Sequence, residues 1–131
     1  MRKKNREQNW FSIDKIHEIT EVVSDEIANT EEYLLGLTEN KNIICVMGDN
    51  IINRSFRLYK EQMIYVECFE RQVSRWEKEV QSDEQKKDVE SFALHTKQFR
   101  ELTEKVILLL KELNKGSKDK KLDSLKSLIK C

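Results

Sequence analysis

The chain contains no proline and only three glycines among its 131 residues. Proteins built from strands and tight turns need frequent turn-forming residues, and disordered low-complexity chains are usually rich in proline or glycine. Leucine, isoleucine and valine instead recur at intervals of three and four between many charged residues, a pattern typical of long amphipathic helices. The sequence therefore predicts an all-α protein, and its length is that of a single domain.

Three long helices and a short fourth are expected, the long ones forming an antiparallel up-down-up bundle. The first covers about residues 12–40, begins with Ser12 as the N-cap, and has one apolar seam: Ile16, Thr20, Val23, Ile27, Thr30, Leu34 and Leu37. The second covers about residues 50–80 and has two adjacent stripes: Ile52, Tyr59, Val66, Val73 and Val80, and beside them Ile51, Leu58, Tyr65, Phe69 and Trp76. Because two stripes cover about half of the helix surface, the second helix is predicted to be the middle one.

The third helix is expected over about residues 83–114, after a capping box formed by Ser82 and Gln85. Its predicted seam has heptad spacing: Phe92, His95, Phe99, Leu102, Val106, Leu109 and Leu113. Only about three residues separate it from the second helix, so the two must form an antiparallel hairpin. Gly116 is a suitable helix end. The apolar run Ile43–Met47 is predicted either to cap the bundle or to extend one of the helices.

A short amphipathic helix is expected over about residues 117–130. Its apolar residues, Leu122, Leu125, Leu128 and Ile129, recur at helical spacing among lysines. Three destinations fit such a segment: docking back on the bundle, which we favour, a groove on a partner, or weak contact with an anionic membrane surface. Residues 1–11 form a separate basic arm in this interpretation, and residues 12–131 form one bundle domain.

Net charge is zero over the whole chain, but its distribution is uneven. Acidic residues follow the outer face of the first helix, opposite its apolar seam: Asp14, Glu18, Glu21, Asp25, Glu32 and Glu39. Basic residues follow the outer face of the second: Arg57, Lys60, Arg71, Arg75 and Lys78. A solvated face usually mixes both signs, so these two stripes are the candidate partner-binding residues, for a protein partner or a second copy.

No motif for catalysis, cofactor binding or metal binding is present, so the sequence predicts no enzyme, no cofactor and no metal. Neither histidine belongs to a Glu-x-x-His motif, and His17 with Glu21 is interpreted as a surface ion pair. The three cysteines have no metal-ligand or redox spacing, which favours reduced thiols in the cytoplasm. The longest apolar run has only five residues, far below the ~20 that span a bilayer.

The predicted function is therefore that of a non-catalytic interaction protein, an adaptor, assembly subunit or regulator, acting through helix-face contacts and self-associating. One alternative is a phosphotransfer module, because Ala93-Leu94-His95-Thr96-Lys97 bears some resemblance to histidine phosphotransfer domains. Lysine follows at +2 rather than +3 there, and His95 lies in the seam, with Glu70 as a candidate partner. Another alternative is a nucleic-acid accessory factor that uses the basic stripe and basic termini, although no aromatic residues are interleaved with that stripe. No resemblance is specific enough to assign a family.

Overall fold

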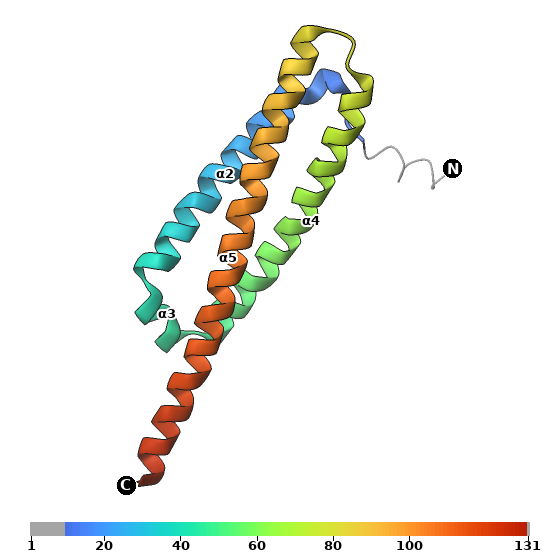
Figure 1. Ribbon diagram of the computed structural model, residues 1–131. Helices are drawn as coiled ribbons and strands as arrows, with labels where there is room; N and C mark the ends of the chain where they lie inside the picture. The colour runs from blue at the N-terminus through green and yellow to red at the C-terminus, as the bar shows by residue number, and fades with distance from the viewer. Residues whose placement is uncertain (1–9, 131) are drawn as a thin grey trace, which may run out of the picture.

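The computed structural model describes the backbone of residues 10–130 and the side chains of residues 10–44 and 48–116. A 3-10 turn, η1 (Ile13–Lys15), leads into α2 (Ile16–Glu39), which is followed by α3 (Lys41–Met47), α4 (Asp49–Glu79) and α5 (Asp83–Lys130). No strand occurs in this part of the chain. The three long helices lie side by side, with α4 antiparallel to α2 and α5 (Figure 1). The predicted all-α, up-down-up bundle is confirmed.

The two predicted N-caps, Ser12 and Ser82, are confirmed as caps, but Ser12 caps the 3-10 turn η1, and α2 itself begins at Ile16 with no side-chain cap. The Ser12 hydroxyl accepts a hydrogen bond from the Asp14 backbone N–H, and the Ser82 hydroxyl accepts one from the Gln85 N–H at 3.1 Å. Gln85 in turn accepts from the backbone N–H of Gln81 at 2.8 Å. These side chains satisfy N–H groups that have no partner within the first turn of a helix.

The prediction that the second helix is the middle one is wrong. α5 packs along both α2 and α4, whereas α2 and α4 barely approach each other. Only one of the two predicted stripes on α4 faces the bundle throughout, since Ile51, Leu58 and Tyr65 of the other are more than half exposed. α5 can contact two neighbours because partly buried residues beside its seam, Leu102, Ile107 and Leu109, also pack against the core and widen its apolar face.

That buried face is shifted by one residue at every second position of the predicted seam. Phe92, Phe99 and Val106 are buried as predicted, but Thr96 and Thr103 are buried in place of His95 and Leu102. Each threonine hydroxyl donates to the carbonyl oxygen four residues earlier, Phe92 or Phe99, so its burial leaves no unsatisfied donor. Among the α5 side chains that the structure describes, up to residue 116, the buried ones are Val89, Phe92, Thr96, Phe99, Thr103, Val106, Leu110 and Leu113.

A polar layer divides the interior into two apolar clusters. Gln62 of α4 donates from Nε2 to the hydroxyl oxygens of Thr30 on α2, at 3.1 Å, and Thr103 on α5, at 3.0 Å. One cluster, around Trp76 and Phe92, lies on one side of this layer, and the other, around Tyr59 and Leu110, lies on the opposite side. A polar layer tied across three helices fixes their axial register, because a shift would leave these groups unpaired.

α5 continues without a break through Gly116 to Lys130, so the predicted helix end at Gly116 and the separate short helix are wrong. Glycine costs only about 1 kcal/mol relative to alanine inside a helix, and the residues around it are mainly helix-forming lysine and leucine. No glycine in the described residues has a positive φ. Instead of folding back onto the bundle, the end of α5 extends beyond α3 (Figure 1). The predicted apolar contacts of residues 117–130 lie outside the described side chains.

Residues 41–47 form a short helix of their own, which settles the path that the sequence leaves open. α3 packs against α5, and Ile44 joins the cluster around Tyr59 and Leu110. α3 therefore closes that end of the bundle, as one of the two predictions had it.

Candidate functional site: the groove between α2 and α4

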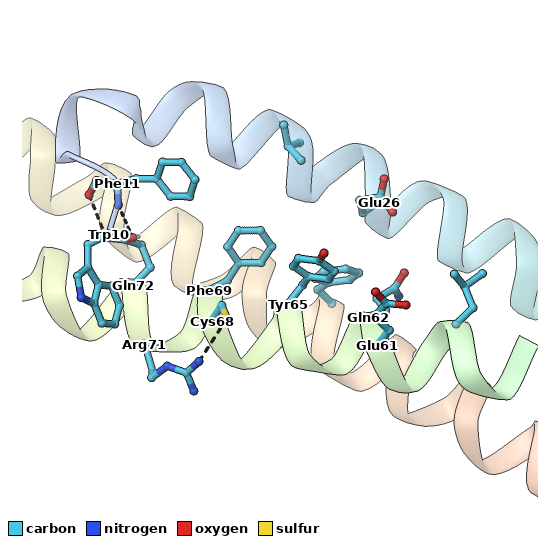
Figure 2. A pocket seen from close by; sticks show the side chains of 13 residues that line it. Trp10, Phe11, Glu26, Glu61, Gln62, Tyr65, Cys68, Phe69, Arg71 and Gln72 are labelled. Carbon is cyan, nitrogen blue, oxygen red and sulfur yellow. Dashed lines mark hydrogen bonds between the residues drawn. The ribbon is translucent and has the colours of Figure 1, made fainter. Parts of the chain in front are cut away.

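A groove of about 970 Å³ runs between α2 and α4, with α5 beneath it. Figure 2 shows Phe11, Tyr65 and Phe69 projecting into the space between the two helices. Phe99 of α5 contributes to the floor, where Phe69 packs against it and against Phe92. The lining residues are mostly apolar: Trp10, Phe11, Val22, Glu26, Leu58, Glu61, Gln62, Tyr65, Cys68, Phe69, Arg71, Gln72 and Phe99.

The walls of the groove hold large apolar side chains that no described part of the chain covers. Leu58 is 59% exposed, Tyr65 57% and Val22 54%. Leu58 and Tyr65 are one heptad apart on α4, and Val22 faces them from α2. Single exposed apolar residues are ordinary on a protein surface, but a contiguous patch in a groove usually marks a binding surface.

One end of the groove is closed by the segment that precedes α2. The side-chain amide of Gln72 accepts from the Phe11 N–H at 2.8 Å and donates to the Phe11 carbonyl at 3.1 Å. Trp76 donates its indole N–H to the same carbonyl at 2.9 Å, and Trp10 stacks against the Arg75 guanidinium. These contacts fix residues 10 and 11 on α4, so the end of the groove is preformed.

A second hollow, of about 470 Å³, lies farther along the same two helices toward α3. Tyr33, Gly36 and Leu37 of α2 line it together with Ile44 and Ile51. Between the two hollows the helices are tied by the Gln62 layer and by a 2.6 Å hydrogen bond from the Tyr33 hydroxyl to Ser55. The uncovered face therefore extends over most of the length of α2 and α4.

The predicted acidic stripe borders this face. All six of its carboxylates are exposed. Glu18 and Asp25 lie four residues before and three after Val22, so they are its neighbours on the surface of α2. Glu32 lines the smaller hollow. Two acidic residues outside the stripe, Glu26 and Glu61, line the main groove itself.

The predicted basic stripe is also exposed, but only Arg71 lines the groove, where it donates to the sulfur of Cys68 at 3.3 Å. Lys60 lies over the ring of Phe56, and Arg75 pairs with Glu79 at 3.2 Å. The stripe therefore follows the outer side of α4, and the two stripes do not meet within one molecule. The rim of the groove is mainly acidic on its α2 side.

The residues proposed for other chemistry have structural partners that differ from those predicted. Glu70 forms a two-point ion pair with Arg100, at 2.6 and 2.7 Å, rather than a bond to His95. Its hydrogen bonds from Arg100 lower the Glu70 pKa, because they stabilise the ionised carboxylate. His95, which is half-buried, has its Nδ1 2.8 Å from the carbonyl oxygen of Ser91. His17 Nε2 lies 3.2 Å from a carboxylate oxygen of Asp88 on α5, rather than pairing with Glu21 as predicted.

Among the described residues no group of three or more side chains is placed to hold a metal ion, and no helix has the length and apolar character needed to cross a membrane. Comparison with known proteins finds no family model, no curated protein and no solved structure that matches this chain. The groove is therefore the feature on which a function can be argued.

Sequence reasoning missed the groove, although its signal was present. The sequence prediction places both apolar stripes of α4 inside the bundle and therefore expects Leu58 and Tyr65 to be covered. A helix with two apolar stripes is equally compatible with packing one stripe on a helix of the same chain and the other on a helix of another chain.

Proposed function

We propose that this protein is a non-catalytic interaction module whose groove between α2 and α4 receives an amphipathic helix from another protein chain. The observation that carries the proposal is the exposed apolar face formed by Val22, Leu58 and Tyr65 over the Phe69 and Phe99 floor. Two helices that both pack on α5, and whose backbones lie too far apart to pack closely on each other, leave the space that a fourth helix occupies in a four-helix bundle.

The shape and the fixed walls of the groove support this proposal. Helices that dock in grooves place apolar residues at positions i, i+3, i+4 and i+7 against such a surface. The Gln62 layer, and the hydrogen bonds of the Phe11 backbone to Gln72 and Trp76, hold the walls in place. A docking helix would therefore find a preformed site and lose less free energy to ordering it.

The charge stripes have a role in the same proposal. Exposed ion pairs contribute only about 0.2–1 kcal/mol each, so the apolar floor would supply affinity. The acidic rim on α2 would favour a helix with basic flanks and would speed its approach. No observation in the structure favours phosphotransfer by His95 or nucleic-acid binding by α4 over this function.

Site-specific photo-crosslinking tests the proposal. A benzophenone amino acid is placed at Tyr65 in the groove, and a matched protein carries it at Leu94, which is 69% exposed on α5 away from the groove. The proposal predicts adducts from position 65 that map to one helix-forming apolar segment, and no comparable adduct from position 94. Equal or absent labelling from the two positions would contradict it.

A further inference from the structure

We propose that the helix received by the groove is the segment 117–130 of a second copy of this chain, so that two copies exchange the distal ends of α5. This inference rests on the proposed function, because it names the occupant of the same groove. Reciprocal exchange fills the grooves of both copies at once and gives a closed twofold dimer.

The segment has the composition of a groove-binding helix. Its backbone is helical through Lys130. In the sequence, Leu122, Leu125 and Leu128 recur every three residues with Ile129 beside them, among five lysines and two aspartates. Such a pattern gives one apolar face with basic flanks.

A chain cannot easily fill its own groove with this segment. α5 is one uninterrupted helix from Asp83 to Lys130, and its distal end extends away from the bundle beyond α3 (Figure 1). Folding back would require breaking that helix, at the cost of its hydrogen bonds in at least one turn. A second copy can receive the segment with the helix intact.

Charge and length agree with this occupant. The groove exposes carboxylates at Glu26 and Glu61, with Glu18 and Asp25 on its α2 rim, and the segment supplies lysines. Residues 118–130 form a helix of about 20 Å at 1.5 Å per residue, and the α4 wall from Leu58 to Gln72 has a similar length of about 21 Å. The segment can thus run along the whole wall, and its apolar stripe from Leu122 to Ile129, about 10 Å long, covers about half of it.

Matched lysine substitutions in the full-length chain test the exchange. Leu58→Lys changes the groove, Leu125→Lys changes the segment, and Leu94→Lys changes an exposed leucine on the outer face of α5. Leu58 and Leu94 are both more than half exposed, so these two variants are expected to keep the fold, and circular dichroism of all three provides the check. Sedimentation velocity over a range of concentrations then measures self-association.

The wild type and the Leu94→Lys variant should dimerise equally. Each of the other two variants should dimerise at least about tenfold more weakly, because a leucine that the dimer would bury becomes a charge. An equimolar mixture of the Leu58→Lys and Leu125→Lys chains should regain association. In that mixture the intact segment of the first chain meets the intact groove of the second. Salt at about 0.5 M should weaken the dimer, because the attraction between exposed charges is then screened beyond ~5 Å.

Two kinds of result would overturn the inference and would separate it from the proposed function. If Leu58→Lys abolishes association but Leu125→Lys does not, the groove binds another helix, and only the exchange is refuted. A wild type that stays monomeric at high concentration, or a segment that binds anionic lipid vesicles in place of a second copy, also refutes the exchange. If groove substitutions alter neither association nor the Tyr65 crosslinks, the proposed function itself falls.

Discussion

At the scale of single residues, the relative positions of the three long helices depend on a few polar side chains that hydrogen-bond between helices. Gln62, Thr30 and Thr103 form a layer across three helices, and Glu70 pairs with Arg100 between α4 and α5. Among the described side chains that are not exposed, no buried nitrogen or oxygen atom lacks a hydrogen-bond partner. Polar groups satisfied in this way specify register, whereas the apolar clusters supply most of the stability.

Replacing Gln62 with alanine should lower the free energy of unfolding by about 1–2 kcal/mol, because two hydrogen bonds are lost. The two threonine hydroxyls would keep their bonds to the carbonyl oxygens of Glu26 and Phe99, which limits the loss. Urea unfolding measures the effect, and Gln98→Ala on the exposed surface of α5 is the control. Equal stability of the two variants would show that the layer does not contribute.

The Glu70–Arg100 pair should make stability depend on pH in the acid range. Since Arg100 lowers the Glu70 pKa in the folded protein, the unfolded chain takes up a proton first as pH falls through about 4.3. The pair's contribution is therefore present at neutral pH and is lost as pH falls toward the folded-state pKa.

A Glu70→Gln variant should be less stable than the wild type at pH 7, by about 1 kcal/mol or less because both partners are part-exposed. The difference should shrink as pH falls below about 4.3, the ordinary glutamate pKa, and vanish once Glu70 is protonated in the folded protein. Thermal unfolding of both proteins between pH 3 and pH 7 measures this, with Glu77→Gln, an exposed residue of the same helix, as the control. A difference that does not change with pH would contradict the assigned pairing.

At the scale of elements, α5 determines the architecture. It is the longest helix and the one that packs against both other long helices. Its buried face alternates apolar residues with threonines that bond to their own helix, so an apolar pattern alone places the seam one residue away. Its passage through Gly116 is what carries residues 117–130 beyond the bundle.

The continuity of α5 leads to a prediction for glycine. If Gly116 lies inside a helix, Gly116→Ala should stabilise the chain by up to about 1 kcal/mol or increase its helicity. Gly36→Ala in α2 is the matched control, because an added Cβ there would meet no atom within 4 Å. Circular dichroism and urea unfolding measure both variants. Destabilisation by Gly116→Ala alone would indicate a left-handed helix end at that position.

At the scale of the whole molecule, the spacing of apolar residues alone predicted the all-α fold class, the three long helices and their order along the chain. It also predicted most buried positions on α2 and α4, such as Val23 and Val66. It could not predict which helix is central, since that depends on the relative rotation of three helices, and apolar spacing does not determine whether a stripe such as Leu58–Tyr65 is covered. Both charge stripes are exposed, as the sequence predicts. Which of them lies beside the groove could not be predicted, because that depends on how the helices pack.

The most direct measurement of the central claim, that the α2/α4 face is a docking surface, is the solvent exposure of its methyl groups. A soluble paramagnetic agent broadens NMR signals of exposed methyls, and Leu94 and Leu108 on the outer face of α5 are exposed references. We expect strong broadening of Val22 and Leu58 in dilute protein and its loss as concentration rises, while Leu94 and Leu108 stay accessible. If Val22 and Leu58 are protected even when dilute, the open docking surface is contradicted. If they remain as accessible as the references at every concentration, the exchange between copies is contradicted.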